Sequence, residues 1–186
     1  TLFRSRSRRY KLDITELDKT EYKNYPLHFQ YQTDGYYDVD QDPNDLFLIK
    51  LILKPFGKVI KKEFIDHLFQ DYLENPSAFA LRDGNKLIGY LEVARETWHK
   101  RLRVTNILIQ PEYRGQGYGS ILMQLAKKIG QEEGMREIIL ETQSCNIKAI
   151  DFYLKHGFTV VGIDLSAYTN QDVESKEVRL EMGCAL

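Results

Sequence analysis

The most informative part of this 186-residue sequence is Arg114-Gly115-Gln116-Gly117-Tyr118-Gly119-Ser120, called the glycine turn below. It follows a predicted strand at residues 104–109 and leads into a predicted amphipathic helix at residues 117–131. The first N–H groups of a helix have no partners within the helix, and the helix dipole adds partial positive charge there. Glycines let a bulky anion approach the main chain closely. The glycine turn therefore predicts a diphosphate site, beside which Arg114 adds a positive charge.

Two other phosphate-binding patterns do not fit the glycine turn. A P-loop requires Gly, four residues and then Gly-Lys-Ser/Thr, and no lysine occupies such a position. A Rossmann turn requires its third glycine three residues after the second, whereas Gly119 follows Gly117 by two. A strand-to-helix turn that binds no ligand remains the alternative.

The chain resembles the GNAT superfamily of N-acetyltransferases in two motifs. Arg114, Gly117 and Gly119 match its Gln/Arg-x-x-Gly-x-Gly/Ala signature in register. The second motif lies on the next predicted strand and helix and comprises Asn146, Ala149, Phe152, Tyr153, Gly157 and Phe158. The resemblance covers residues 86–163. It implies an α/β GNAT fold, with a mixed, mostly antiparallel central sheet of six to seven strands and helices on both faces.

The resemblance also implies how residues would hold acetyl-CoA. The diphosphate would lie on the glycine turn, which consists of Arg114, Gly115, Gln116, Gly117, Tyr118, Gly119 and Ser120. The main chain of Ile107, Leu108 and Ile109 would pair with the pantetheine arm as an added strand does. Asn146 and Ala149 would lie beside that arm, although Asn146 is also a plausible helix N-cap.

Transfer of acetyl from a thioester to an amine requires a neutral amine and benefits from a proton donor for the leaving thiolate. The resemblance implies that Tyr153 contacts acetyl-CoA and is the general acid that protonates the leaving thiolate. Glu141, inside the matching motif, is the preferred base. Glu92, Glu96 and a water chain remain alternatives to it.

Within the superfamily, the chain is similar to the streptothricin acetyltransferases, which acetylate an amine of a cationic antibiotic. The similarity rests on residues 140–143, on the second motif, and on Gly162, Asp164 and Tyr168. That branch has an acidic pair in its fourth strand, where this chain has Thr105-Asn106. We therefore expect direct acetyl transfer to a primary amine of a small molecule or a lysine side chain. A streptothricin-type resistance enzyme and a non-catalytic, regulatory CoA-binding module are the alternatives.

Composition narrows the class of protein. The chain has 26 Lys and Arg against 27 Asp and Glu, which argues against a nucleic-acid partner. Two cysteines, Cys145 and Cys184, form neither a disulfide framework nor a zinc site, and no metal is expected. No apolar run reaches the roughly 20 residues of a membrane span. These features favour a cytoplasmic enzyme without membrane or metal, and they leave a homodimer open.

We expect a single domain over residues 1–186, with a substrate-side half at 1–80 and an acetyl-CoA-binding core at 86–163. The predicted strands are 10–17, 27–32, 46–53, 78–81, 86–94, 104–109, 137–141, 160–163 and 177–182. Residues 33–45 are expected to form a loop. The predicted helices are 58–73, 117–131 and 146–156.

Overall fold

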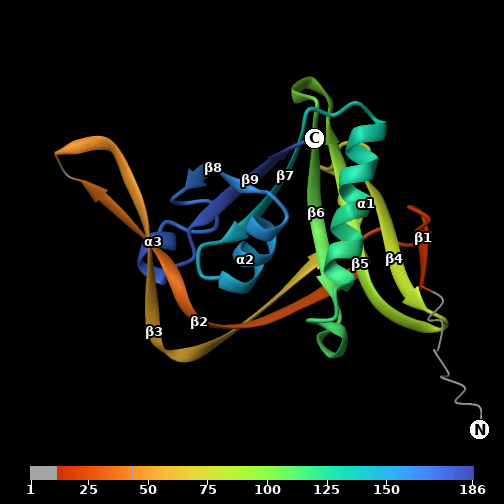
Figure 1. The fold of residues 1–186 in the computed structure, drawn as a ribbon, viewed down its shortest axis with the longest axis horizontal. Coiled ribbons are helices and arrows are strands. Elements are labelled where there is room, and N and C mark those ends of the chain that lie inside the picture. The colour runs from red at the N-terminus through yellow and green to blue at the C-terminus, as the bar shows by residue number, and fades with distance from the viewer. Residues whose placement is uncertain (1–11, 43) are drawn as a thin grey trace, which may run out of the picture.

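The computed structural model describes residues 12–42 and 44–186, and its main feature is a seven-stranded sheet with the order β1-β4-β5-β6-β7-β9-β8 (Figure 1). All neighbours in this sheet are antiparallel except β6 and β7, which are parallel. The strands are β1 Leu12–Glu16, β4 Ser77–Asp83, β5 Lys86–Glu96, β6 Arg101–Ile109, β7 Glu137–Gln143, β8 Thr159–Asp164 and β9 Arg179–Ala185. The predicted α/β class with a mixed, mostly antiparallel sheet is confirmed.

Two helices connect strands of this sheet. Helix α1, Tyr118–Glu132, joins β6 to β7, and helix α2, Ile147–Lys155, joins β7 to β8. Residues of both helices belong to one core cluster, which contains Leu122 of α1, Tyr153 of α2 and Leu81 of β4. The second cluster contains no residue of α1 or α2 among those described. Both helices therefore pack on one face of the sheet, whereas helices were expected on both faces.

A long hairpin takes the place of a helix on the second face. Its strands are β2, Pro26–Asp42, and β3, Asp45–His67, and they form a separate two-stranded sheet. At its base, Leu27 and Leu68 are buried against Ala78 and Ala80 of β4. These alanines alternate with Phe79 and Leu81, which face the helices, so the hairpin covers the opposite face. Its far end projects beyond the sheet (Figure 1).

The hairpin corrects two predictions. Residues 33–45 were expected to form a loop and residues 58–73 a helix, but most of both segments is strand. Phe64, Ile65, Leu68 and Phe69 have helical spacing, yet Phe64 pairs with Phe29 of β2 and their rings stack at 4.8 Å. Cross-strand pairing therefore outweighs a local periodicity that a helix would also satisfy.

The second half of the chain agrees more closely with the prediction. The β4–β5 hairpin, the strands β6 to β9 and both helices lie where they were expected, within a few residues at each end. The short helix α3, Asp172–Ser175, and the 3-10 turns Thr97–His99 and Pro111–Tyr113 were not predicted. The start of the strand expected at 10–17 lies outside the described residues. None of the helices in the described part of the chain is long and apolar enough to span a membrane.

Candidate functional site

The parallel strands β6 and β7 separate halfway along their length. They pair only between Arg101–Val104 and Glu137–Leu140, although β6 continues to Ile109 and β7 to Gln143. A register shift between β5 and β6 falls at Glu92 and Val93, so Thr105 is an extra residue at the point of separation. Beyond this bulge, the side of β6 that faces β7 is an open edge at residues 105–109.

The buried Glu92 fixes this bulge. One carboxylate oxygen accepts hydrogen bonds from Thr105 Oγ1 at 2.6 Å and from Asn106 Nδ2 at 2.9 Å. The other accepts from the main-chain N–H of Phe69 at 2.6 Å, at the exit of the long hairpin. Because Glu92 is fully buried and both oxygens are occupied, its geometry is that of an anchor rather than of a base open to substrate.

Only every second residue of β6 directs its main-chain N–H and C=O groups toward the open edge. The carbonyl oxygen of Leu108 points toward β5, since a Cβ on Gly89 would lie only 2.2 Å from it. Main-chain groups alternate in direction along a strand, so those of Ile107 and Ile109 point toward the open edge. Arg114 Nε already donates to the Ile109 oxygen at 2.9 Å. Ile107 and Ile109 therefore suit main-chain pairing with a ligand, whereas the main chain of Leu108 is turned toward β5.

The glycine turn places unpaired N–H groups at the start of α1. Gly115 and Gly117 have φ values of 75° and 87°, and open space surrounds the position of an added Cβ at each. Gly117 is the N-cap of α1. Within the described part of the chain, the N–H groups from Gly115 to Gly119 have no hydrogen-bond acceptor. An anion can satisfy these groups, so the geometry fits a diphosphate.

The remaining residues of the turn hold it in place. Gly119 allows α1 to pack on α2, because an added Cβ would lie 3.2 Å from the Phe152 ring. The Ser120 hydroxyl lies 3.0 Å from His156 Nε2. Gln116 Nε2 donates back to the Glu112 carbonyl at 3.1 Å. The Tyr118 ring meets the Tyr113 ring edge to face. The side chains of these residues thus shape the turn, while the main chain faces solvent.

Arg114 connects the turn to the long hairpin. Its Nη1 donates to the Gln30 carbonyl at 2.7 Å, in addition to the Nε bond to Ile109. No carboxylate of a described residue lies within ion-pair distance of its guanidinium. Burial lowers the pKa of Arg114 from its ordinary value, but a guanidinium stays charged at neutral pH. Arg114 therefore contributes an uncompensated positive charge beside the glycine turn.

Helix α2, which packs on α1 at Gly119, carries the next group of predicted site residues: Asn146 at its N-cap, Ala149 and Tyr153. Asn146 caps the helix, because its Oδ1 accepts from the Ala149 N–H at 3.4 Å. Tyr153 is buried between the rings of Phe152 and Phe158, with centroids 5.5 and 5.9 Å away. Burial raises the pKa of Tyr153 to about 12. Its hydroxyl makes no hydrogen bond to another described residue, so it is a protonated, unengaged donor at neutral pH.

Glu141 lies on the other face of the sheet from Tyr153. Its neighbour Leu140 belongs to the helix-side core together with Tyr153, and successive side chains of a strand point to opposite faces. Glu141 accepts from the Tyr168 hydroxyl at 3.1 Å and pairs with Arg179 at 2.9 Å. The structure therefore does not bring the two predicted catalytic residues together on one face.

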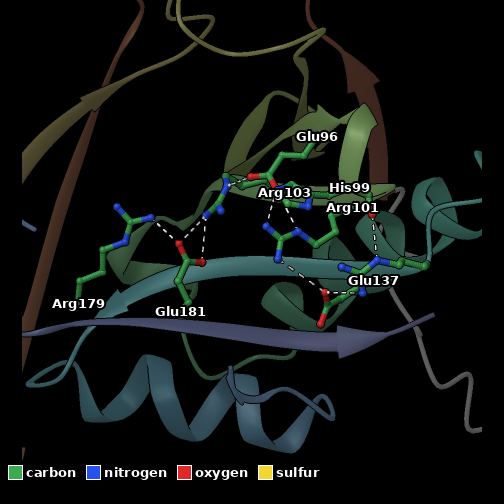
Figure 2. A network of polar contacts seen from close by, with 8 residues as sticks. Glu96, His99, Arg101, Arg103, Glu137, Arg179 and Glu181 are labelled. Carbon is green, nitrogen blue, oxygen red and sulfur yellow. Dashed lines mark hydrogen bonds and ion pairs between the residues drawn. The ribbon is translucent and has the colours of Figure 1, made fainter. Parts of the chain in front are cut away.

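A series of ion pairs crosses this face and includes Glu96, Arg103, Glu181 and Arg179 (Figure 2), and Arg179 extends it to Glu141. Arg103 Nε donates to Glu96 at 2.6 Å, and Arg103 Nη1 lies 3.2 Å from Glu181. Arg179 pairs with both Glu181 and Glu141. Opposite charges alternate from β5 to β9, so the carboxylates of Glu96 and Glu141, the remaining candidate bases, are already compensated by arginines.

The long hairpin contacts the C-terminal end of β7 and the residues next to it. The sequence did not predict this contact. The Tyr31 hydroxyl donates to Gln143 Oε1 at 2.6 Å and lies 3.4 Å from Cys145 Sγ. Lys62 of β3 pairs with Glu177, and Gln143 Nε2 donates to the same carboxylate at 3.3 Å. The alternation of Leu27, Phe29 and Tyr31 was the available signal for this strand. Among the described residues, no cluster of metal-binding side chains is present.

Comparison with known proteins identifies the class to which this site belongs. The profile of the acetyltransferase (GNAT) family matches residues 14–158. The chain therefore belongs to the GNAT family of acetyltransferases.

Its relatives include streptothricin acetyltransferases. Those of Streptomyces lavendulae and Escherichia coli are 32% and 30% identical over 103 and 120 residues, which cover 55% and 64% of this chain. The matched segments span 54% and 67% of these relatives. A nourseothricin acetyltransferase structure superposes with a TM-score of 0.74 at 27% identity and covers 94% of this chain and 98% of its own. These findings confirm the resemblance to the streptothricin branch.

If Glu92 anchors the bulge, its replacement should lower the free energy of unfolding. In Glu92→Gln, the new amide NH2 faces the donors of Phe69 or of Thr105 and Asn106, and at least one buried donor loses its acceptor. The free energy of unfolding should fall by about 2 kcal/mol. Urea denaturation measures this change.

Glu132→Gln is the matched control, because Glu132 is exposed and lies 3.7 Å from Lys128 on the same helix. Its unfolding free energy should change by less than about 0.5 kcal/mol. Equal stability of the two variants would contradict the anchoring role of Glu92.

Proposed function

We propose that this protein transfers the acetyl group of acetyl-CoA directly to a primary amine. The observation that carries the proposal is the row of unpaired N–H groups from Gly115 to Gly119, next to the open edge of β6. Family membership supports acetyl-CoA as the co-substrate, and the glycine turn has the geometry for its diphosphate. We assign residues 86–163 to binding of the co-substrate and the first 80 residues to the acceptor side.

Each residue has a physical role in this proposal. Ile107 and Ile109 offer main-chain groups for the amides of the pantetheine arm, and Asn146 holds the start of α2 beside them. When bound, acetyl-CoA supplies an activated acetyl group. As the amine nitrogen bonds to the carbonyl carbon, the C–S bond breaks and the CoA sulfur leaves as a thiolate. Tyr153 holds the proton that this thiolate takes, because its hydroxyl is neutral and unengaged. A water chain accepts the proton of the amine, since the candidate carboxylates are engaged.

We further propose that the acceptor is a cationic antibiotic of the streptothricin class. The names of the relatives support this, as does the 27% identical nourseothricin acetyltransferase that matches the whole fold. The branch's acidic pair is absent at Thr105 and Asn106, but both side chains donate to Glu92 on the neighbouring strand. Glu92 has no cationic partner among the described residues. Glu92 therefore supplies a carboxylate beside the position of the branch's acidic pair, and a carboxylate there favours a cationic acceptor.

Thiol release from acetyl-CoA tests this proposal with streptothricin, spermidine, an aminoglycoside and a lysine peptide as acceptors. We expect kcat/KM for streptothricin to exceed that for the other amines by at least about tenfold, a difference of roughly 1.4 kcal/mol in transition-state binding. Inert streptothricin beside a rapidly acetylated small amine would overturn the acceptor assignment. Acetyl-CoA binding without thiol release for any amine would favour the non-catalytic module.

Tyr153→Phe tests the acid role. The loss of the proton donor should lower kcat by at least about tenfold while the Kd for CoA changes less than about twofold. Because the pKa of Tyr153 is raised to about 12, its proton is retained at lower pH and lost only as pH rises through that value. The wild-type rate should therefore show no loss from this group below about pH 10.

Tyr113→Phe is the matched control, because it removes a tyrosine hydroxyl near the glycine turn but outside the proposed acid position. Its kcat should equal that of the wild type. Retention of full kcat by Tyr153→Phe would reject the acid assignment.

A further inference from the structure

A pocket of about 370 Å³ lies where three elements meet beside the glycine turn. Its walls are residues 30–32 and 61–63 of the long hairpin, Pro111 and Arg114 before α1, and Lys148 in the first turn of α2. Four of these side chains are cations, and Glu63 is the one carboxylate among the lining residues that the structure describes. The pocket is therefore positively charged.

Three of the four cations lack an acidic partner. Lys62 pairs with Glu177, but Lys61, Arg114 and Lys148 form no ion pair with any described carboxylate. Elsewhere on the hairpin, Lys54 is paired with Asp38. Three positive charges without an ion-pair partner among the described residues thus line this one pocket.

The position of Lys148 increases the electrostatic imbalance. Lys148 is the second residue of α2, where the partial positive charge of the helix end disfavours a cation. The first turn of α2 contains no acidic residue, and neither does that of α1. An anion in the pocket would stabilise both the lysine and the helix end, whereas a cationic amine would be repelled. The pocket therefore fits the co-substrate rather than the acceptor.

We propose that Lys61 and Lys148 bind the 3′-phosphate monoester of acetyl-CoA. This inference rests on the proposed function, which places the diphosphate on the N–H groups of residues 115–119. A phosphate monoester carries a charge of about −1.5 to −2 at neutral pH, which two lysines can match. The hairpin, through Lys61, thus takes part in recognition of the co-substrate as well as covering the acceptor side of the sheet.

Calorimetric binding of CoA and of 3′-dephospho-CoA tests the proposal without depending on turnover. The wild type should bind CoA at least about tenfold more tightly than the dephospho form, because charge-assisted hydrogen bonds to the phosphate are lost in the latter. In the double variant Lys61→Gln/Lys148→Gln, the two Kd values should agree within about twofold, about 0.4 kcal/mol. Affinity for 3′-dephospho-CoA itself should be unchanged.

Lys58→Gln is the control, because Lys58 is an exposed lysine of the same strand outside the pocket. It should keep the full preference for CoA. Equal binding of the two ligands by the wild type, or an undiminished preference in the double variant, would overturn the subsite. Inorganic phosphate is titrated separately. If it binds as tightly as CoA does, the pocket is a site for free phosphate and the proposed subsite is overturned. A preference that the double variant loses supports the subsite even if no amine is acetylated.

Discussion

The site exists because the β6–β7 ladder ends halfway along the two strands. Four residues of each strand pair, and a bulge at Thr105 then turns β6 away while Glu92 satisfies the displaced side chains. A longer ladder would occupy the main-chain groups of Ile107 and Ile109. The separation leaves those groups without a strand partner, directly before the turn that exposes the N–H groups of α1, and of the two carbonyl oxygens that of Ile109 accepts from Arg114. A buried carboxylate therefore maintains the opening in the sheet.

The two faces of the sheet carry different chemistry. The helix side holds the neutral, buried Tyr153 and the glycine turn, and the uncompensated cations lie at the edge of that turn. The opposite side carries Glu141 and its series of ion pairs, and the base of the long hairpin covers it. The uncompensated positive charge therefore lies on the side where the anionic co-substrate is proposed to bind, whereas the charges of the Glu141 side are balanced among themselves.

The sequence predicted the second half of the chain well because its signals there are local. Glycines after a strand, the Asn146 cap and the Gly157 stop each fix a boundary through nearby main-chain geometry. Of the hairpin, the sequence predicted only the strands 27–32 and 46–53, which lie within β2 and β3. Their pairing was missed because it joins residues far apart in the sequence, and the spacing of Phe64, Ile65, Leu68 and Phe69 satisfies a helix as well. The roles of Glu92 and Lys61 depend on that pairing. No local pattern distinguishes them from exposed charges.

Amide chemical shifts on titration with CoA show directly whether the glycine turn and the open edge of β6 hold the co-substrate. We expect the N–H groups of residues 115–119, together with those of Ile107 and Ile109, to shift strongly and to exchange more slowly with solvent. The distant end of α1 should remain unaffected. Binding of CoA that leaves the amides of residues 115–119 unchanged would show that the glycine turn does not hold the diphosphate.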